Sequence, residues 1–599
     1  MRVSAVLLTA LCLLPSCGRG PRESAPNLVL ISIDTLRWDR LGCTGHEGAE
    51  TPNIDALATR GALFKNAVAP APLTLPSHAT MLTGLLPLEH GLRDNGPYRL
   101  DPRFETLAEG LSSRGYATYA VIGAKPLEAG HGLEQGFEHY DDQIGAQVEG
   151  SVLLAERPAD QVTTAALARL ARHDRTRPFF LFVHYFDAHA PYAPPPPYRD
   201  RFREQPYDGE VAFLDREVGR LLRELDRGGH LRRSVLVLTA DHGDSFGEHG
   251  EESHAFFLYD DTIRVPLIVV DALGETAGDR ASQVRLQDLR AFFEARADQR
   301  PFDLTAPAAR GEPALIESLY GAIHCGFAQL RGLRLPGGTK YLESGLEEFY
   351  DLESDPHERQ DLSARRPGQV EAARSLLARL LNRAGGQALP GPGTSLPGYL
   401  SMPADPKLVL QRTREENQAA DAPKTRLDSI RALQEGVRFH EQGLFDAASA
   451  LLEPASRKDP KNPALHFRLG LSLRSAATVN DDRGQLERAV TAFERALALR
   501  PGLPGARPLL IHALGQLGRY QEAFELGREA LALDAPPSKD LEVLGMLFHT
   551  PQGHFAREPN PLYDFQKGIE TLERAVRAGS DNPKIQAYLE QCYARGAGR

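Results

Sequence analysis

A repeating pattern of strand followed by helix constrains the fold of this chain more than any other feature. Continuous apolar, β-branched runs cover residues 27–33, 178–183 and 234–239, and charged helical stretches precede the last two. Such runs are typical of strands that are buried on both faces of a sheet. Strands that alternate with helices predict an α/β domain with a mainly parallel central sheet. The composition agrees, since 42% hydrophobic and 25% charged residues are ordinary for a globular protein.

Polar residues follow each of these three runs. Asp34 ends the first, the Asp187/His189 pair follows the second, and Asp241 and His242 follow the third. In open α/β sheets, ligands bind beyond the carboxyl ends of the strands. Acids and imidazoles at three converging strand ends therefore predict a metal site at this edge.

The N-terminus has the pattern of an export signal. A single Arg2 precedes an apolar run over residues 5–14, which is too short to span a bilayer and fits a secretory signal peptide over residues 1–17. Residues 14–17, Leu-Pro-Ser-Cys, resemble a bacterial lipobox, in which Cys17 would be acylated. We expect an exported lipoprotein of the bacterial cell envelope, in the periplasm or at the outer membrane. A plain cleaved signal peptide is the alternative.

Charge and cysteine content exclude several classes of protein. The 69 Lys and Arg residues against 80 Asp and Glu residues give a net charge of −11, which argues against a nucleic-acid partner. We expect membrane contact only through the N-terminal lipid anchor. Beyond the leader, only Cys43, Cys325 and Cys592 remain, without a C-x-x-C pair, so neither a disulfide framework nor a thiolate zinc site is expected.

The C-terminal part repeats a helical pattern. Ala489 and Ala523 are 34 residues apart, as are Ala496 and Ala530. This period and the small residues at helix crossings resemble the tetratricopeptide repeat. For residues 428–599 we expect an all-α superhelix that binds a protein partner, with an anonymous helical bundle as the alternative. Residues 366–427 begin with a helical pattern, become rich in Gly and Pro, and are expected to form a linker.

Within the first part, ordered motifs carry a family resemblance. They are Asn27–Asp34, Thr51–Asp55, Thr74–Gly84, Phe186–Tyr192, Thr239–Gly250, Arg264–Ile268 and Tyr350–Glu358. In content and order they resemble the sulfatase family of the alkaline phosphatase superfamily. The resemblance implies a sulfatase-like, alkaline phosphatase-like domain over residues 26–365.

The nucleophile position departs from this family. Sulfatases carry a C-x-P-S-R motif whose Cys is oxidised to formylglycine, whereas this chain has Thr74-Leu-Pro-Ser-His78. A formylglycine hydrate expels sulfate by collapsing to an aldehyde, but a Thr ester has no such exit. Water must instead attack the central atom of the covalent intermediate. We therefore expect Thr74 to act as a nucleophile on phosphate or phosphonate mono- or diesters rather than on sulfate esters.

By resemblance, one divalent metal ion is held by Asp34, Asp241 and His242, with Thr74 as the reactive fourth ligand. The family's second N-terminal acid is replaced by Thr35. Fewer carboxylates and an added imidazole favour Zn²⁺ or Mn²⁺ over Ca²⁺. A two-metal site would need a longer Asp-to-His spacing than that of Asp187 and His189, which are two positions apart, so a single ion is expected.

The resemblance also implies roles around the ester. His189 and His254 are expected to be catalytic, as oxyanion or leaving-group contacts, and Asn95 and His78 to bind substrate. His254 stands where the family has a Lys, and His78 where it has an Arg. His184 and His249 are expected to be structural.

Two classes of function follow. The first is a metal-dependent ester hydrolase, sulfatase- or phosphodiesterase-like, acting on a small-molecule, glycan-linked or lipid-linked ester. A sulfuric ester hydrolase or a phospho-group transferase of the same fold is a close variant. The second is an inactive scaffold whose repeat domain binds a protein partner.

Overall fold

The computed structural model describes two long stretches of the chain, residues 25–383 and 444–577, and isolated residues between 429 and 440 and at 589. The gaps within these stretches are 97, 145–156, 191, 250, 252, 273, 275–276, 326–328, 345–346, 501–502, 504–505, 532–537, 550–555, 557–558 and 563–564. The predicted leader over residues 1–17 lies outside the described residues.

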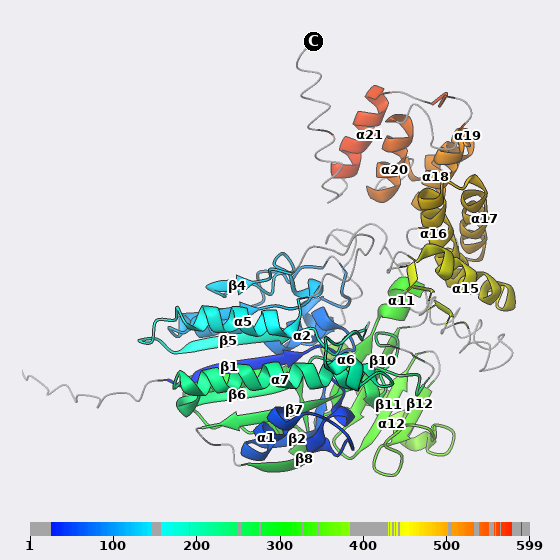
Figure 1. The fold of residues 1–599 in the computed structure, drawn as a ribbon. Coiled ribbons are helices and arrows are strands. Elements are labelled where there is room, and N and C mark those ends of the chain that lie inside the picture. Colours follow the sequence, from blue (N-terminus) through cyan, green and yellow to red (C-terminus); the bar gives the residue numbers. More distant parts are fainter. Residues whose placement is uncertain are drawn as a thin grey trace, which may run out of the picture.

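A large eight-stranded sheet forms the centre of the N-terminal domain (Figure 1). Its strand order is β4-β3-β5-β1-β6-β7-β2-β8. The central strand β1 pairs in parallel with β5 and β6, while β7 runs antiparallel to both β6 and β2. The prediction of a mainly parallel sheet is therefore confirmed. The strands are β1 (Asn27–Ile33), β2 (Ala62–Val68), β3 (Ala117–Val121), β4 (His139–Asp141), β5 (Phe179–Tyr185), β6 (Ser234–Ala240), β7 (Arg264–Asp271) and β8 (Gly278–Arg285).

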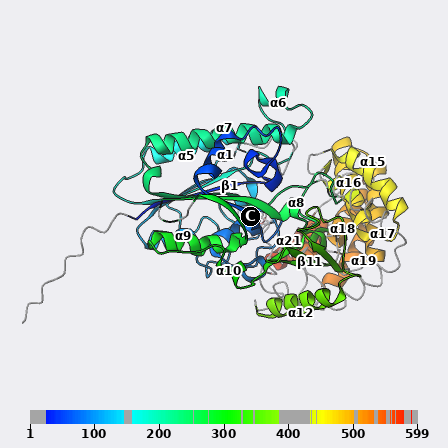
Figure 2. The same ribbon diagram turned by 90° about the horizontal axis from the view of Figure 1, so that it is seen from below.

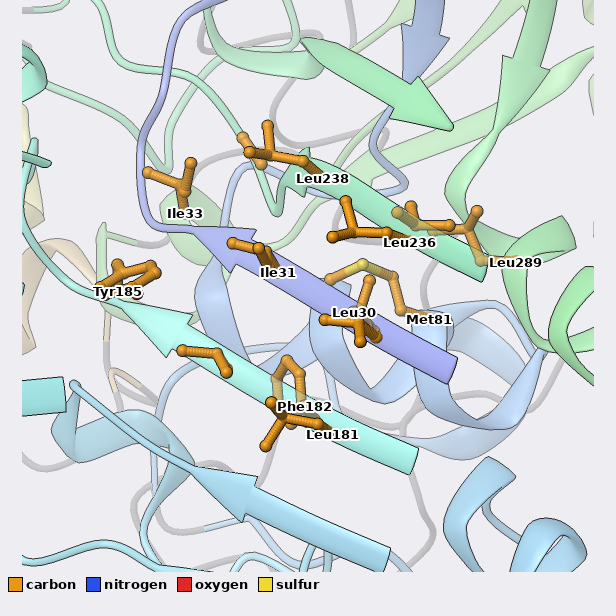
Figure 3. Close-up of a cluster of buried hydrophobic side chains, with 14 of the residues drawn as sticks. Leu30, Ile31, Ile33, Met81, Leu181, Phe182, Tyr185, Leu236, Leu238 and Leu289 are labelled. Carbon is orange, nitrogen blue, oxygen red and sulfur yellow. The ribbon is translucent and has the colours of Figure 1, made fainter. Parts of the chain in front are cut away.

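Helices cover both faces of this sheet (Figure 2). One face carries α1 (Pro52–Arg60), α5 (Ala159–Leu170) and α7 (Pro206–Arg227), which contact one another. The other face carries α2 (Thr74–Thr83), α4 (Leu107–Ser113) and α9 (Leu289–Ala297). Leu30 of β1 and Met81 of α2 lie in the core on this second side (Figure 3). Burial on both faces explains why β1, β5 and β6 are continuously apolar.

A second, antiparallel sheet follows, in the order β12-β11-β10-β9. Its strands are β9 (Ala314–Ser318), β10 (Leu330–Leu335), β11 (Thr339–Glu343) and β12 (Glu347–Asp351). Helix α12 (Pro367–Arg383) packs Val370, Ala373 and Leu377 against this sheet. The predicted linker over 366–427 therefore begins too early, because the apolar stripe of α12 is covered by the sheet. Residues 384–428 lie outside the described residues.

The described C-terminal region is helical, and consecutive helices from α15 to α21 contact one another. It contains α15 (Phe445–Lys458), α16 (Pro463–Asn480), α17 (Arg483–Leu499), α18 (Ala506–Leu517), α19 (Tyr520–Leu531), α20 (Ser538–His549) and α21 (Phe565–Arg577). Its core includes Phe256 of the N-terminal domain, and α16 contacts α11 (Tyr320–Cys325). The short helices are α3 (Pro87–His90), α6 (Tyr198–Arg201), α8 (Asp260–Ile263) and α10 (Ala306–Ala309). None of the described helices has the length and apolarity needed to cross a membrane.

Candidate metal centre and nucleophile

Two parallel strands place the predicted metal ligands side by side. Residue Ile33 at the end of β1 pairs with Ala240 at the end of β6, so Asp34 and Asp241 emerge at the same level of the sheet. One ligand atom each from Asp34, Asp241 and His242 lie within 4.8 Å of one another, and all three side chains are buried. The structure thus brings together the three protein ligands implied by the sequence.

Local hydrogen bonds occupy one side-chain atom of Asp241 and one of His242, and the other ligand atom of each residue lies close to the Asp34 carboxylate or to its neighbour in the cluster. The Asp241 Oδ1 atom accepts the backbone N–H of His242 at 2.9 Å, and His242 Nδ1 donates to the Gly243 carbonyl at 2.8 Å. The His242 Nε2 lone pair is therefore free, 3.7 Å from Asp34 Oδ1 and 3.5 Å from Asp241 Oδ2. Both Asp34 oxygens, Asp241 Oδ2 and His242 Nε2 are buried without a hydrogen-bond partner among the described residues. A bound cation would satisfy all four atoms.

The electrostatics of the cluster also favour a cation. Burial, together with the charges of Asp241 and Asp244, raises the pKa of Asp34 well above its usual value, and the Thr74 hydroxyl only partly opposes this. Burial likewise raises the pKa of Asp241 and lowers that of His242 to about 3, which keeps the imidazole neutral. Carboxylates bind metal ions in their ionised form, and imidazole binds them in its neutral form. Two carboxyl groups beside a neutral imidazole therefore match the donor set of a divalent metal ion.

Thr74 lies at the first position of α2, where the backbone N–H groups of a helix have no intrahelical acceptor. Its side chain is only 2% exposed. The half-buried Asn95 accepts the backbone N–H of Leu75 through Oδ1 at 2.8 Å, which holds its amide beside the nucleophile. This position is compatible with the substrate-binding role expected for Asn95.

Histidines 189 and 254 lie together with His242. The ring centroid of His254 is 5.1 Å from that of His189 and 4.6 Å from that of His242. His254 Nδ1 donates to Asp244 Oδ1 at 3.0 Å, and Tyr192 donates its hydroxyl proton to Asp244 Oδ2 at 2.5 Å. Although burial opposes the charge, these two hydrogen bonds lower the pKa of Asp244. An ionised Asp244 fixes the tautomer of His254 and orients its ring.

His78 takes a different place from the one expected. It is fully buried, its Nδ1 donates to the Thr74 carbonyl at 2.8 Å, and its Nε2 lies 2.9 Å from the Ser32 hydroxyl. Both ring nitrogens are engaged by the protein, so the structure gives His78 a positioning role beneath Thr74 rather than a contact with substrate. The shorter imidazole does not extend past α2 as an Arg side chain would.

The sequence reasoning missed Asp244, Tyr192 and the placement of His184. Asp244 stands two residues after His242 in the sequence. An acid so close to a predicted metal ligand could have been recognised as a candidate partner for a nearby histidine. His184 was expected to be structural, yet its Nε2 lies 3.6 Å from Asp34 Oδ2. His249, by contrast, stacks on Tyr259 with ring centroids 3.7 Å apart.

A cavity of about 380 Å³ begins at His189. Its lining combines charged groups with apolar walls, and includes Arg157, Asp187, Glu210, Phe213 and Arg216. Arg157 also forms an ion pair with Asp141 at 2.9 Å. The cavity therefore lies beside one of the two histidines predicted to be catalytic.

The fold and site combine an α/β domain with a buried donor set of the kind that binds metal ions, beside the Thr74 hydroxyl at one sheet edge. Residues 26–291 match the family model described as Sulfatase. Over these residues the N-terminal domain is similar to the sulfatase family.

The curated relatives that match this chain are also sulfatases. The chain is 25% identical over 333 residues to an arylsulfatase of Clostridium perfringens, covering 41% of this chain and 68% of that protein. It is 28% identical over 381 residues to mouse iduronate 2-sulfatase, covering 49% of this chain and 68% of that protein. It is 29% identical over 265 residues to human arylsulfatase A, covering 36% of this chain and 52% of that protein. The chain therefore spans between about half and two thirds of these relatives.

Solved structures share the fold. One, determined with its substrate D-glucosamine-2-N,6-O-disulfate, superposes with a TM-score of 0.53 at 19% identity, covering 61% of this chain and 99% of that chain. Another, the phosphonate monoester hydrolase of Agrobacterium radiobacter, has a TM-score of 0.50 at 21% identity, covering 60% of this chain and 96% of that chain. Identities this low support the fold alone.

Proposed function

We propose that the N-terminal domain is a metal-dependent ester hydrolase that uses Thr74 as its nucleophile. The observation that carries this proposal is the set of buried, unpartnered atoms of Asp34, Asp241 and His242 beside the Thr74 hydroxyl. A divalent ion bound there would lower the pKa of a neighbouring hydroxyl and stabilise negative charge on the ester oxygens.

The chain's own residues account for the remaining chemistry. Thr74 Oγ gives up its proton to solvent and attacks the central atom of the ester, the bond to the leaving oxygen breaks, and His254 donates a proton to that oxygen. Water then attacks the same central atom and gives one proton to His254, the bond to Thr74 breaks, and Thr74 Oγ takes a proton back from solvent. His254 suits both halves because Asp244 orients it, so that the neutral ring left by the first step can accept the proton of the attacking water. Helix α2 directs its N-terminal dipole toward the developing charge.

Phosphate and phosphonate mono- or diesters are the substrates we favour. A covalent Thr ester is hydrolysed only when water attacks the central atom, because Thr cannot collapse to an aldehyde as a formylglycine hydrate does. Phosphorus is better suited than sulfur to this attack. The cavity beyond His189 would take the leaving group, and its charged and apolar lining suits a glycan or a lipid headgroup. The three curated relatives named above are sulfatases, so a sulfuric ester hydrolase is the second candidate.

Zn²⁺ or Mn²⁺ is the ion we favour. Thr35 stands where a further carboxylate would be needed, and its hydroxyl instead donates to the Ala188 carbonyl at 2.8 Å. An imidazole in place of an oxygen ligand shifts preference from Ca²⁺ toward transition metals.

The test is hydrolysis of aryl phosphate, phosphodiester, phosphonate and sulfate substrates by the metal-loaded full chain. Thr74→Ala should lose about 10³-fold or more in kcat/KM on the phosphorus esters. Thr74→Ser should retain part of the activity. Thr83→Ala, at the far end of the same helix, is the matched control and should remain close to wild type. Sulfate turnover that survives in Thr74→Ala would contradict the nucleophile assignment.

For the other parts of the chain we propose an acylated Cys17 that anchors the protein in the bacterial envelope, and a tetratricopeptide-type superhelix that binds a protein partner. The 34-residue spacing of Ala489 and Ala523 supports the second proposal. Failure of the metal-loaded protein to turn over any ester would favour the inactive scaffold instead.

A further inference from the structure

His184 is the buried polar side chain that the proposed chemistry leaves unused. It lies on β5, in register with Ser32 of β1, among the apolar residues of the strand. Its side chain is fully buried, and neither ring nitrogen has a hydrogen-bond partner among the described residues. Buried imidazoles are normally hydrogen-bonded, because a buried polar nitrogen without a partner destabilises the fold.

The His184 ring is aimed at the metal ligands. Its Nε2 lies 3.6 Å from Asp34 Oδ2, while the other oxygen of the same carboxylate, Oδ1, lies 3.7 Å from His242 Nε2. Asp34 therefore presents one oxygen to each imidazole. Ligand atoms of His184 and Asp241 also lie within 4.8 Å of one another.

We propose that His184 is a further ligand of the metal ion, so that the centre holds two imidazoles and two carboxylates from the protein. The proposal rests on the proposed metal-dependent function and adds a residue to its site.

The neighbouring His78 does not serve this role. Its ring centroid is 4.9 Å from that of His184, but the Thr74 carbonyl and the Ser32 hydroxyl already engage both of its nitrogens. His78 thus packs edge-on against His184 and limits how far that ring can turn. The second imidazole also explains how the site manages without the carboxylate that Thr35 replaces.

The experiment uses the full chain, stripped of metal and titrated with Mn²⁺. In the wild type we expect one bound equivalent and pulsed EPR couplings from two imidazole nitrogens. In His184→Leu we expect one imidazole and at least a 10-fold weaker Kd for Mn²⁺. The melting temperature of metal-free His184→Leu should equal or exceed that of the wild type, because no hydrogen bond is lost.

His90→Leu is the matched control. His90 is also buried, but it hydrogen-bonds Thr80 and the Leu92 N–H at 3.1 Å each. This variant should lower the melting temperature and leave both imidazole couplings intact. One imidazole in the wild type, unchanged Mn²⁺ affinity in His184→Leu, or two bound equivalents would overturn the inference while leaving the proposed function standing. A wild-type protein that binds no metal would overturn both.

Discussion

Two buried polar clusters in the N-terminal domain use the same residue types in opposite ways. The metal-site cluster contains Asp34 and Asp241. The ion-pair cluster contains Asp260 and Glu358, and both of these carboxylates lie 2.6 Å from the Nζ atom of Lys340. Arg334 adds a second cation, 3.0 Å from Asp260.

The difference lies in who supplies the positive charge. In the ion-pair cluster the chain supplies it. Arg334 and Lys340 lower the pKa of Asp260 although burial opposes this, whereas burial raises the pKa of Glu358 to about 7 and Lys340 only partly opposes the rise. Among the described residues, no Lys or Arg forms an ion pair with Asp34 or Asp241, and the pKa of both is raised. A self-neutralised cluster holds the structure together, whereas an uncompensated one needs a cation from outside.

A third buried carboxylate, Asp244, hydrogen-bonds His254, one of the two histidines proposed to be catalytic, beside the metal-site cluster. In Asp244→Asn, the partner that fixes the His254 tautomer is lost, and we expect kcat to fall by about 10²- to 10⁴-fold. Metal content, measured by mass spectrometry, should stay at the wild-type level because Asp244 is outside the ligand set. A rate within threefold of wild type would show that His254 acts without Asp244.

The ion-pair cluster should be sensitive to loss of its shared cation. Lys340→Met removes the cation that pairs with Glu358 and leaves Asp260 with Arg334 alone, and we expect the free energy of unfolding to drop by about 3–5 kcal/mol. Urea denaturation measures this change. The exposed Arg374–Glu347 pair is the control, and Arg374→Met should cost about 0–1 kcal/mol. Equal losses in the two variants would remove the distinction between buried and surface pairs.

The same chemical change should have opposite signs in the two clusters. Asp34→Asn removes an uncompensated charge, so it should raise the stability of the metal-free protein by about 1–3 kcal/mol while abolishing metal binding. Asp260→Asn removes a compensated charge and should lower stability. Melting temperatures in EDTA compare the two variants. Destabilisation by Asp34→Asn would mean that Asp34 has a protein partner.

The smallest effect is a pH dependence. Since the pKa of Asp34 is raised by folding, the folded metal-free protein retains a proton that the unfolded chain loses near pH 4. This contribution to stability is fully present below the unfolded pKa and is lost as pH rises through the folded pKa. The metal-free wild type should therefore lose stability relative to Asp34→Asn between about pH 4 and neutrality. Parallel stability curves for the two proteins would contradict the raised pKa.

Much of this site could be predicted from the sequence. The ends of β1 and β6 meet because parallel neighbours share a carboxyl edge, so Asp34 and Asp241 follow from the strand pattern alone. His184 could not be recognised in the same way. The sequence pattern around a single His in an apolar strand is the same whether its imidazole is hydrogen-bonded to a neighbouring residue or binds a metal ion.

The contacts that individual side chains make were the other feature that could not be predicted from the sequence. His78 occupies a position where a longer Arg would extend toward substrate, but its two nitrogens are held by Thr74 and Ser32. Likewise, the start of α12 was expected to belong to a linker, because its apolar stripe gives no indication of the antiparallel sheet that covers it. Both outcomes depend on contacts between segments distant in sequence.

Anomalous diffraction from crystals grown with Mn²⁺ or Zn²⁺ tests the central claim most directly. We predict an anomalous peak of the added metal between Asp34 Oδ, Asp241 Oδ2 and His242 Nε2, adjacent to Thr74, and none at the ion-pair cluster. A metal-site cluster that shows only ordered water, or a metal bound elsewhere in the domain with Asp34 and Asp241 hydrogen-bonded to the protein, would contradict it.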